Sequence, residues 1–266
     1  SYVAARALGG SFGTREAQGV VSRTHALGRG GEGRYGTLAH TWFGGWRDAD
    51  GFRANSALDK RAGSGKVFWT SPGARVRVGA IARLQALDTD APGYLTAAEA
   101  RATPRLSPGF ADADGGSVDT RQASVHLELR PTATLAASAR VYDQRFERVR
   151  YVRFSAAGAQ QERVEDERQR GAIAELSWSP TALARVAGRL SAGADWQDQD
   201  NVQQRYRTAA RVREATLRDH AFTFTNGGGY ARANATLAGR LTLDAGLRLD
   251  RVGGDFRNRQ TDAELP

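Results

Sequence analysis

The sequence contains no cysteine, which excludes disulfide bonds and any chemistry that needs a thiolate. It has no run of about 18 apolar residues, so a membrane-spanning helix is excluded as well. The first residues, SYVAARALGG, lack the charged and apolar regions of a signal peptide. Apolar helical stripes and fully apolar strands, which would fill the core of a soluble domain, are also missing, and the mean hydropathy is -0.52. The chain therefore does not resemble an ordinary soluble two-layer domain.

Alternation of apolar and polar residues is the strongest pattern that is present. Between Ala174 and Trp196, apolar residues occupy every second position on both sides of a tight turn at 179–181. This period places apolar side chains on one face of a strand and polar side chains on the other. A β-barrel in a membrane needs apolar residues only on the face toward lipid. The pattern therefore predicts a hairpin in the wall of a transmembrane barrel.

The same alternation recurs along the chain and predicts about eleven antiparallel strands, joined up and down. The expected strands cover 2–8, 14–25, 34–46, 61–70, 75–87, 119–130, 133–153, 161–178, 184–196, 221–237 and 240–251. Short turns alternate with long polar loops; the turns are at 71–72, 131–132, 179–180 and 238–239, and the loops at 47–58, 88–117, about 147–163 and about 197–217. Outer-membrane barrels have this asymmetry, with short periplasmic turns and long extracellular loops.

Two local motifs refine the prediction. Thr96 and Glu99 have the spacing of a capping box, which predicts a short helix inside the 88–117 loop. Three glycines at 227–229 interrupt an alternating strand, which predicts a β-bulge there.

The tryptophans lie near the ends of the predicted strands. Trp69 and Trp178 precede short turns that contain proline, and the others precede long loops. Aromatic residues in transmembrane barrels gather at the two membrane surfaces. This distribution predicts two aromatic girdles, formed by Trp42, Trp69, Trp178 and Trp196, with Trp46 beside them.

Four segments carry a resemblance to a known family. They are GSFGT (10–14), DGFRANS (50–56), APGYLT (91–96) and AGLRLDR (245–251). In this order, on alternating strands, they resemble the TonB-dependent receptors of Gram-negative outer membranes. The resemblance extends over nearly the whole chain.

This resemblance implies a barrel of about 22 strands with an N-terminal plug in its lumen. It also implies contact with outer-membrane lipid and lipopolysaccharide, and coupling through the plug to a TonB-type protein. We therefore expect residues 1–266 to be part of the barrel domain, without the plug or the C-terminal half. The expected location is the outer membrane of a Gram-negative bacterium, and the expected function is energy-dependent uptake of a scarce ligand. We expect that this segment alone does not transport.

Loops held on a rigid barrel are the expected place for ligand binding. Arginine offers planar paired donors for carboxylates and phosphates, and aromatic rings offer a stacking surface. Such residues in the loops and upper strand ends predict a site for an anionic ligand, such as a ferric siderophore-like chelate. The predicted ligand-binding residues are Trp46, Arg47, Arg53, Asn55, Tyr94, Arg101, Arg105, Arg145 and Arg148. Alternatively, these arginines contact lipopolysaccharide phosphates or plug carboxylates, or are simply solvated.

The sequence shows no catalytic or metal-binding pattern. The four histidines, His25, His40, His126 and His220, lack zinc-ligand spacing, and there is no GxSxG motif. The net charge of +9 comes from arginines spread along the chain, unlike the basic block of a nucleic-acid-binding protein. We therefore expect no enzyme activity, no cofactor, no bound metal and no nucleic-acid partner. A passive porin-like barrel and a soluble β-rich binding protein are the alternative functions.

Overall fold

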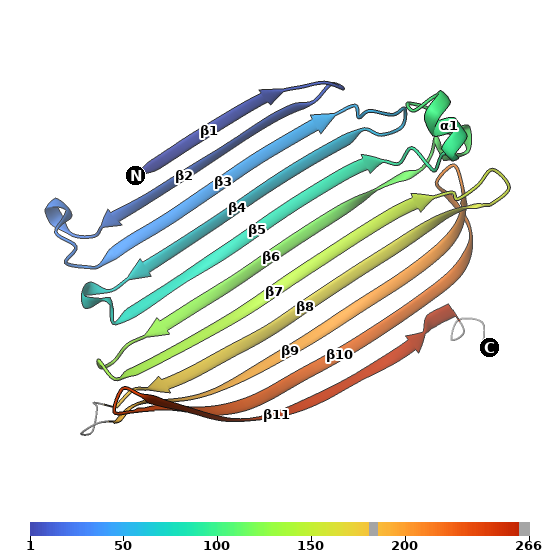
Figure 1. Ribbon diagram of the computed structural model, residues 1–266. Helices are drawn as coiled ribbons and strands as arrows, with labels where there is room; N and C mark the ends of the chain where they lie inside the picture. Colours follow the sequence, from blue (N-terminus) through green and yellow to red (C-terminus); the bar gives the residue numbers. More distant parts are fainter. Residues whose placement is uncertain (181–185, 261–266) are drawn as a thin grey trace.

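The computed structural model describes residues 1–180 and 186–260, and in this part the strands form one sheet in sequential order (Figure 1). The strands are β1 (Tyr2–Gly9), β2 (Arg15–Ala26), β3 (Thr37–Ala49), β4 (Leu58–Thr70), β5 (Val76–Asp90), β6 (Gly115–Leu129), β7 (Leu135–Val152), β8 (Gln160–Trp178), β9 (Val186–Ala209), β10 (Val212–Leu237) and β11 (Leu241–Asn258). All ten neighbouring pairs are antiparallel. The predicted up-and-down all-β architecture with eleven strands is confirmed. The predicted turn residue Thr181 and the predicted strand start at Ala184 lie outside the described residues.

The connections define two ends of the sheet. The end that we call the turn end carries the connections 27–36, 71–75, 130–134 and 238–240, and the loop end carries 10–14, 50–57, 91–114, 153–159 and 210–211. Figure 1 shows the short helix α1 (Ala97–Ala102) at the loop end, and β1 and β11 at opposite edges of the sheet. These two edge strands do not pair with each other in the described part of the chain. None of the helices described is long and apolar enough to cross a membrane.

The loop predicted at 197–217 is wrong, because most of it belongs to β9 and β10. These strands run to Ala209 and from Val212, and a hairpin turn at Ala210 and Arg211 joins them. Both turn residues have positive φ, 46° and 68°, as a type I′ turn requires. Alternation disappears here because polar side chains lie on both faces, while the strand ladder still satisfies the backbone groups. The polar composition of this segment therefore gave no sign in the sequence that β9 and β10 extend beyond the apolar part of the sheet.

Two further boundaries differ from the sequence prediction. The β7–β8 connection covers only 153–159, because the polar residues on either side of it continue the strands. The predicted bulge at 227–229 is wrong, since these glycines pair in continuous register with both neighbouring strands. The irregularities in β10 lie instead between Arg213 and Ala215 and between Thr216 and Arg218. The glycines remove side chains without shifting the register.

The sheet has two chemically different faces. In an antiparallel sheet directly paired residues share a face, and the row Val78, Leu127, Ala139, Ala174 and Ala194 crosses five strands. We call this side the apolar face and the other side the polar face. The predicted girdle tryptophans all lie on the apolar face. Trp69 and Trp178 stand at strand ends as predicted, whereas Trp42 and Trp196 lie within strands that continue past them.

Few side chains are buried, and these lie mainly at the loop end. Ala49, Ala111 and Val152 are the buried apolar residues of the described chain, so no conventional hydrophobic core is present there. The buried polar residues Asp114 and Gln160 occupy the same end of the sheet. The most tightly packed part of the molecule is therefore the part that carries the loops.

Candidate anion-binding site

Arg53 and Asn55 fasten the 50–57 connection to the 91–114 connection. The Arg53 guanidinium donates to the carbonyls of Leu106, Gly93 and Pro92 at 2.8 to 3.0 Å. The Asn55 amide donates to the carbonyls of Ala91, Ala111 and Asp114 at 3.0, 2.7 and 3.3 Å. Both side chains donate hydrogen bonds to backbone carbonyls of the 91–114 connection. These carbonyls have no partner in a neighbouring strand, so the side chains satisfy them. The structure places these predicted ligand-binding residues between loops.

A second network joins the loop end of β6 to β8, β9 and the β9–β10 turn. The carboxylate of Asp114, which is 1% exposed, accepts hydrogen bonds from the Gln160 amide at 2.9 Å and from the Arg153 N–H at 2.7 Å. The Gln160 carbonyl accepts from the Thr208 hydroxyl at 3.1 Å and the Arg211 N–H at 2.9 Å. Sequence reasoning missed this network because its members are far apart in the chain. It holds the ends of β6 to β10 at the loop end of the sheet in one arrangement.

The helix α1 begins with the predicted capping box. The Thr96 hydroxyl accepts from the Glu99 N–H at 3.3 Å, and the Glu99 carboxylate accepts from the Thr96 N–H at 2.8 Å. These bonds to Thr96 lower the pKa of the Glu99 carboxyl below its usual value. Arg101 lies in the last turn of this exposed helix.

Aromatic contacts position two more of the predicted loop residues. The Tyr94 ring stacks on Phe154 with centroids 6.3 Å apart and an interplanar angle of 16°. The Arg105 guanidinium lies 5.4 Å from the ring centroids of both Phe12 and Phe52. Tyr94 therefore lies toward β7 and β8, whereas Arg105 lies toward the first strands.

The predicted strand residues divide between the two faces. Trp46 and Arg145 lie on the apolar face. The Trp46 indole N–H donates to the Asp59 carboxylate at 3.3 Å, and Arg145 forms an ion pair with Asp166 at 2.9 Å. Arg47 and Arg148 lie on the polar face, in one row across the sheet. Arg148 pairs with Glu165 at 2.6 Å. The predicted residues are thus not assembled around a single point.

The polar face carries a set of residues that the sequence prediction missed. Arg150, Arg163, Arg205 and Arg218 are directly paired across β7, β8, β9 and β10, and we call this row the arginine ladder. Neighbouring strands lie about 4.8 Å apart, so the ladder spans about 14 Å. Arg205 falls in the segment predicted as a loop, and Arg218 lies between that loop and the next predicted strand, which is why no row could be recognised from the sequence.

The arginine ladder lacks carboxylate partners. Within residues 1–180 and 186–260, no carboxylate lies within ion-pair distance of any of its four arginines. The buried Nε atom of Arg163 has no hydrogen-bond partner. Burial lowers the pKa of Arg163, and the charges of Arg205, Arg150 and Arg218 lower it further. Like charges directly opposite each other destabilise a sheet. An anion at the ladder would relieve this repulsion.

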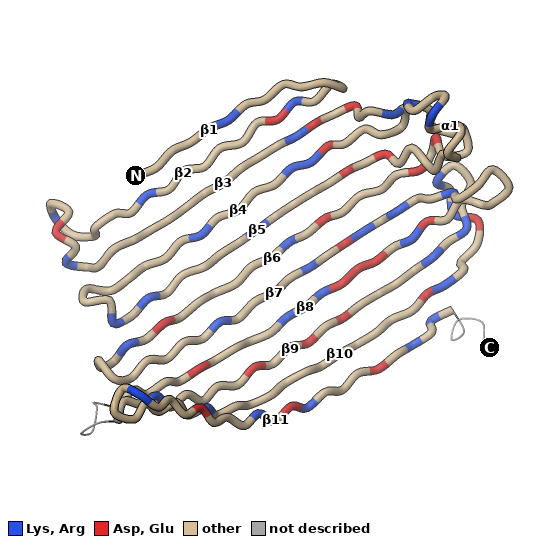
Figure 2. Tube along the Cα trace, in the orientation of Figure 1, with Lys and Arg blue, Asp and Glu red and all other residues tan. Residues whose placement is uncertain are grey.

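An aromatic platform borders the ladder. The Arg163 guanidinium lies 5.3 Å from the centroid of the Phe154 ring, and Phe154 in turn stacks on Tyr94. Figure 2 shows that charged residues gather toward the loop end of β7 to β10. The site therefore combines a row of paired-donor cations with a stacking surface from the loops.

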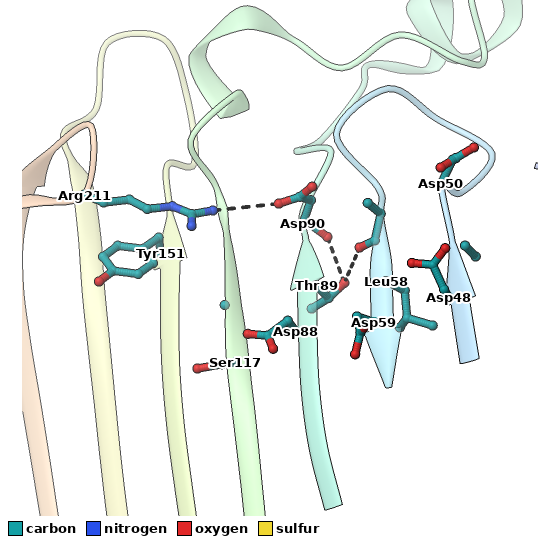
Figure 3. A pocket seen from close by; sticks show the side chains of 13 residues that line it. Asp48, Asp50, Leu58, Asp59, Asp88, Thr89, Asp90, Ser117, Tyr151 and Arg211 are labelled. Carbon is teal, nitrogen blue, oxygen red and sulfur yellow. Dashed lines mark hydrogen bonds and ion pairs between the residues drawn. The ribbon is translucent and has the colours of Figure 1, made fainter. Parts of the chain in front are cut away.

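The opposite face carries a group of aspartates at the loop end. Five aspartates contribute to a pocket of about 300 Å³ (Figure 3); they are Asp48, Asp50, Asp59, Asp88 and Asp90. Asp48, Asp59 and Asp88 are directly paired across three strands, with the parity of Trp46. The described residues contain no group of three His, Cys, Asp or Glu side chains that could hold a metal ion. Because the sheet separates these aspartates from the arginine ladder, they do not neutralise it.

Comparison with known proteins identifies the architecture. Residues 45–265 match the family model described as TonB dependent receptor-like, beta-barrel. No curated protein sequence matches the chain. The solved structures that it matches include the unliganded ferric citrate transporter FecA, with a TM-score of 0.76 and 14% identity over 97% of this chain and 38% of that one.

Two other solved structures give the same result. BauA, the ferric preacinetobactin receptor from Acinetobacter baumannii, matches with a TM-score of 0.72 and 15% identity over 96% of this chain and 41% of that one. The copper transporter OprC matches with a TM-score of 0.62 and 15% identity over 95% of this chain and 36% of that one. The chain thus spans roughly two fifths of the length of these structures. The matched family and structures are receptors and transporters, not enzymes.

Proposed function

Because the chain belongs to the TonB-dependent receptor-like β-barrel family, we propose that it forms part of a receptor for uptake of an anionic metal chelate. The receptor lies in the outer membrane of a Gram-negative bacterium, and a TonB-type protein drives uptake through a plug. The expected ferric siderophore-like chelate fits this proposal, since FecA and BauA are a ferric citrate transporter and a ferric preacinetobactin receptor. Family membership favours this function over a passive porin or a soluble binding protein.

The arginine ladder is the observation that carries the proposal. Its four guanidinium groups face the lumen of the barrel, where a transported ligand passes. A chelate with several carboxylates would place one acceptor on each of several arginines along the row. Without a bound anion, desolvation and mutual repulsion raise the free energy of the charged arginines. A bound anion would lower this free energy. Plug carboxylates could reach the same row, and they would compete with the ligand.

The other predicted residues take separate roles in this proposal. Tyr94, with Phe154, covers the ladder from the loops, and Arg148 stands one row away from it on the polar face. Arg101 and Arg105 offer positive charge at the rim, and Arg47 lies on the polar face of β3. Arg53 and Asn55 position the loops. Trp46 and Arg145 lie on the outward side, and lipopolysaccharide is the expected partner of Arg145 there.

Substitution in the full-length receptor tests the proposal. We expect the double substitution Arg163→Gln and Arg205→Gln to weaken binding of ferric citrate at least tenfold, since each lost charged hydrogen bond costs about 1.5 to 3 kcal/mol. Binding is measured by fluorescence quenching on purified receptor, and uptake by radioactive iron in cells. Arg140→Gln, lower on the same face of β7, is the matched control.

A panel of chelates separates charge from shape. An uncharged ferric hydroxamate should bind equally to the wild type and the double variant. If ferric citrate and other carboxylate chelates bind the double variant as tightly as the wild type, the ladder is not the ligand site.

A further inference from the structure

The half of the apolar face toward the turn end contains a group of basic side chains. Arg23 and His40 are directly paired on β2 and β3, and the Nε2 atoms of His25 and His40 lie 3.2 Å apart. The two imidazole rings are stacked with centroids 5.4 Å apart. All three residues share the face of Trp42 and Trp69. We call Arg23, His25 and His40 the basic cluster.

The depth of the basic cluster places it near a membrane surface. His25 is one residue from the turn end of β2, and Trp69 is one residue from the turn end of β4. A cationic side chain on the lipid face is least costly near the interface and most costly at the midplane. In the part of the chain described, no carboxylate lies within ion-pair distance of Arg23, and His40 Nδ1 is buried without a hydrogen-bond partner. The cluster therefore lacks an anion from the protein itself.

A trough of small residues lies on the same face as the basic cluster, toward the loop end, with Val21 and Trp42 between the two. It has a volume of about 680 Å³ and is lined on this face by Ala5, Ala7, Ala17, Gly19 and Gly44, with Trp46 and Arg61 at its end toward the loops. Arg23 and Gly19 are four residues apart on β2, which corresponds to about 13 Å along the strand. The hydrocarbon layer of one leaflet is about 15 Å thick. An acyl chain of a lipid with its headgroup at the cluster would therefore pass over Val21 and reach the near edge of the trough at Gly19 and Gly44.

The fold itself does not require the glycines of the trough. A Cβ atom at Gly44 would meet no atom within 4 Å, and at Gly19 it would meet only the Ala4 carbonyl at 3.8 Å. Neither glycine has a positive φ. Glycine within a strand weakens the strand and often marks a place where another molecule comes close. An occupant outside the sheet explains their presence, whereas Gly65 is explained within the sheet by the Trp42 ring packed over it.

We propose that the basic cluster and the trough bind an anionic phospholipid of the periplasmic leaflet. Arg23 and the histidine pair contact the phosphate, Trp42 and Trp69 flank the headgroup, and an acyl chain enters the trough at Gly19 and Gly44. The cluster lies at the turn end, which faces the periplasm, whereas lipopolysaccharide occupies the opposite leaflet. This inference rests on the proposed outer-membrane location, but it does not depend on the transported ligand.

Native mass spectrometry of the purified full-length receptor tests the proposal. The probes are dioleoyl phosphatidylglycerol and dioleoyl phosphatidylcholine, which share acyl chains and differ in net charge. We expect the wild type to retain phosphatidylglycerol preferentially, and Arg23→Gln to lower its retention about fivefold, to the level of phosphatidylcholine. Gly44→Val should lower retention of both lipids, while valine keeps or improves strand stability.

Two further measurements complete the test. Lys66→Gln removes a charge from the polar face of β4 and should leave lipid retention unchanged. Uptake of ferric chelates is measured on the same variants, so that loss of lipid binding is distinguished from loss of transport. An unchanged lipid preference in Arg23→Gln, or unchanged retention in Gly44→Val, would overturn the proposal. Dissociation of an oligomer by Gly44→Val, with lipid retention intact, would identify the trough as a protein interface instead.

Discussion

Arg163 stands between Arg150 and Arg205 on the polar face, half-buried and with one nitrogen unpaired. Its position is unfavourable in the free protein and useful only when an anion is present. We expect Arg163→Gln to raise the stability of the ligand-free receptor by about 0.2 to 1 kcal/mol, because like charges directly opposite each other are destabilising. The measurement is the thermal unfolding midpoint of the full-length receptor in detergent.

Added citrate should distinguish the two proteins further. It should raise the midpoint of the wild type more than that of Arg163→Gln, because the intact ladder binds the anion. Arg240→Gln, in the exposed β10–β11 turn, controls for the loss of one positive charge. A lower midpoint for ligand-free Arg163→Gln would mean that Arg163 stabilises the sheet and that repulsion from its neighbours does not dominate.

Glu99 gives the loop end a local dependence on acid. The pKa of its carboxyl is below the usual 4.5 because the carboxylate accepts hydrogen bonds from Thr96. A carboxyl with a depressed pKa stabilises the folded state above its unfolded pKa, and this contribution is lost as the pH falls through the folded pKa. We therefore expect α1 to lose protection from amide exchange below pH 4.5, while β5 stays protected.

The matched variant for this prediction is Glu99→Gln. It keeps an acceptor for Thr96 but cannot titrate, so α1 should show no acid-dependent loss of protection. Exchange is followed by mass spectrometry, with correction for the intrinsic effect of pH. Equal acid sensitivity in Glu99→Gln and the wild type would show that another group controls α1.

At the scale of elements, Arg53 and Asn55 from another loop hold the 91–114 connection. Arg53→Ala removes the hydrogen bonds to Leu106, Gly93 and Pro92. We expect local opening of this connection to become easier by about 2 kcal/mol, because charged hydrogen bonds to backbone carbonyls are lost. Limited proteolysis of the full-length receptor measures this as faster cleavage within 91–114. Arg101→Ala, on the exposed face of α1, should leave the cleavage rate near that of the wild type.

Strand prediction succeeded wherever one face of the strand is apolar. The β5–β6 pair shows this, since Val78 and Leu127 lie opposite each other with polar neighbours on either side. It failed in the upper parts of β9 and β10, where both faces carry polar residues and the period-two signal vanishes. A strand there is held by backbone pairing, which leaves little trace in side-chain polarity.

The candidate site was predictable only in its chemistry. The composition indicates that arginine is plentiful, and the sequence predicts Tyr94 in the 88–117 loop and Arg148 at an upper strand end. The arginine ladder depends on three successive strand registers, and its members are separated by long stretches of sequence. Arg53 was predicted as a ligand contact from its loop position alone, whereas its hydrogen bonds hold two loops together. Only the fold determines which arginines meet.

At the scale of the whole molecule, β1 and β11 leave two unpaired edges in the described sheet. Unpaired backbone groups in lipid cost several kcal/mol each, so an open sheet of this kind does not persist in a bilayer. We expect the 266-residue chain alone to give no ligand uptake in liposomes and no resistance to unfolding in detergent on gels. The full-length receptor, prepared in the same way, is the positive control. Uptake by the 266-residue chain would show that the sheet closes by itself or with a second copy.

The strictly sequential strand order has a consequence for assembly. Every strand adds to the edge left by the strand before it, so contacts form between neighbours in the chain and growth can proceed hairpin by hairpin. Each strand therefore inherits its alignment from its predecessor. A slip by one residue at β8 would send Arg163 to the lipid side of the wall. The register of each new strand pair, set as the sheet grows, therefore determines whether the arginine ladder forms on the polar face.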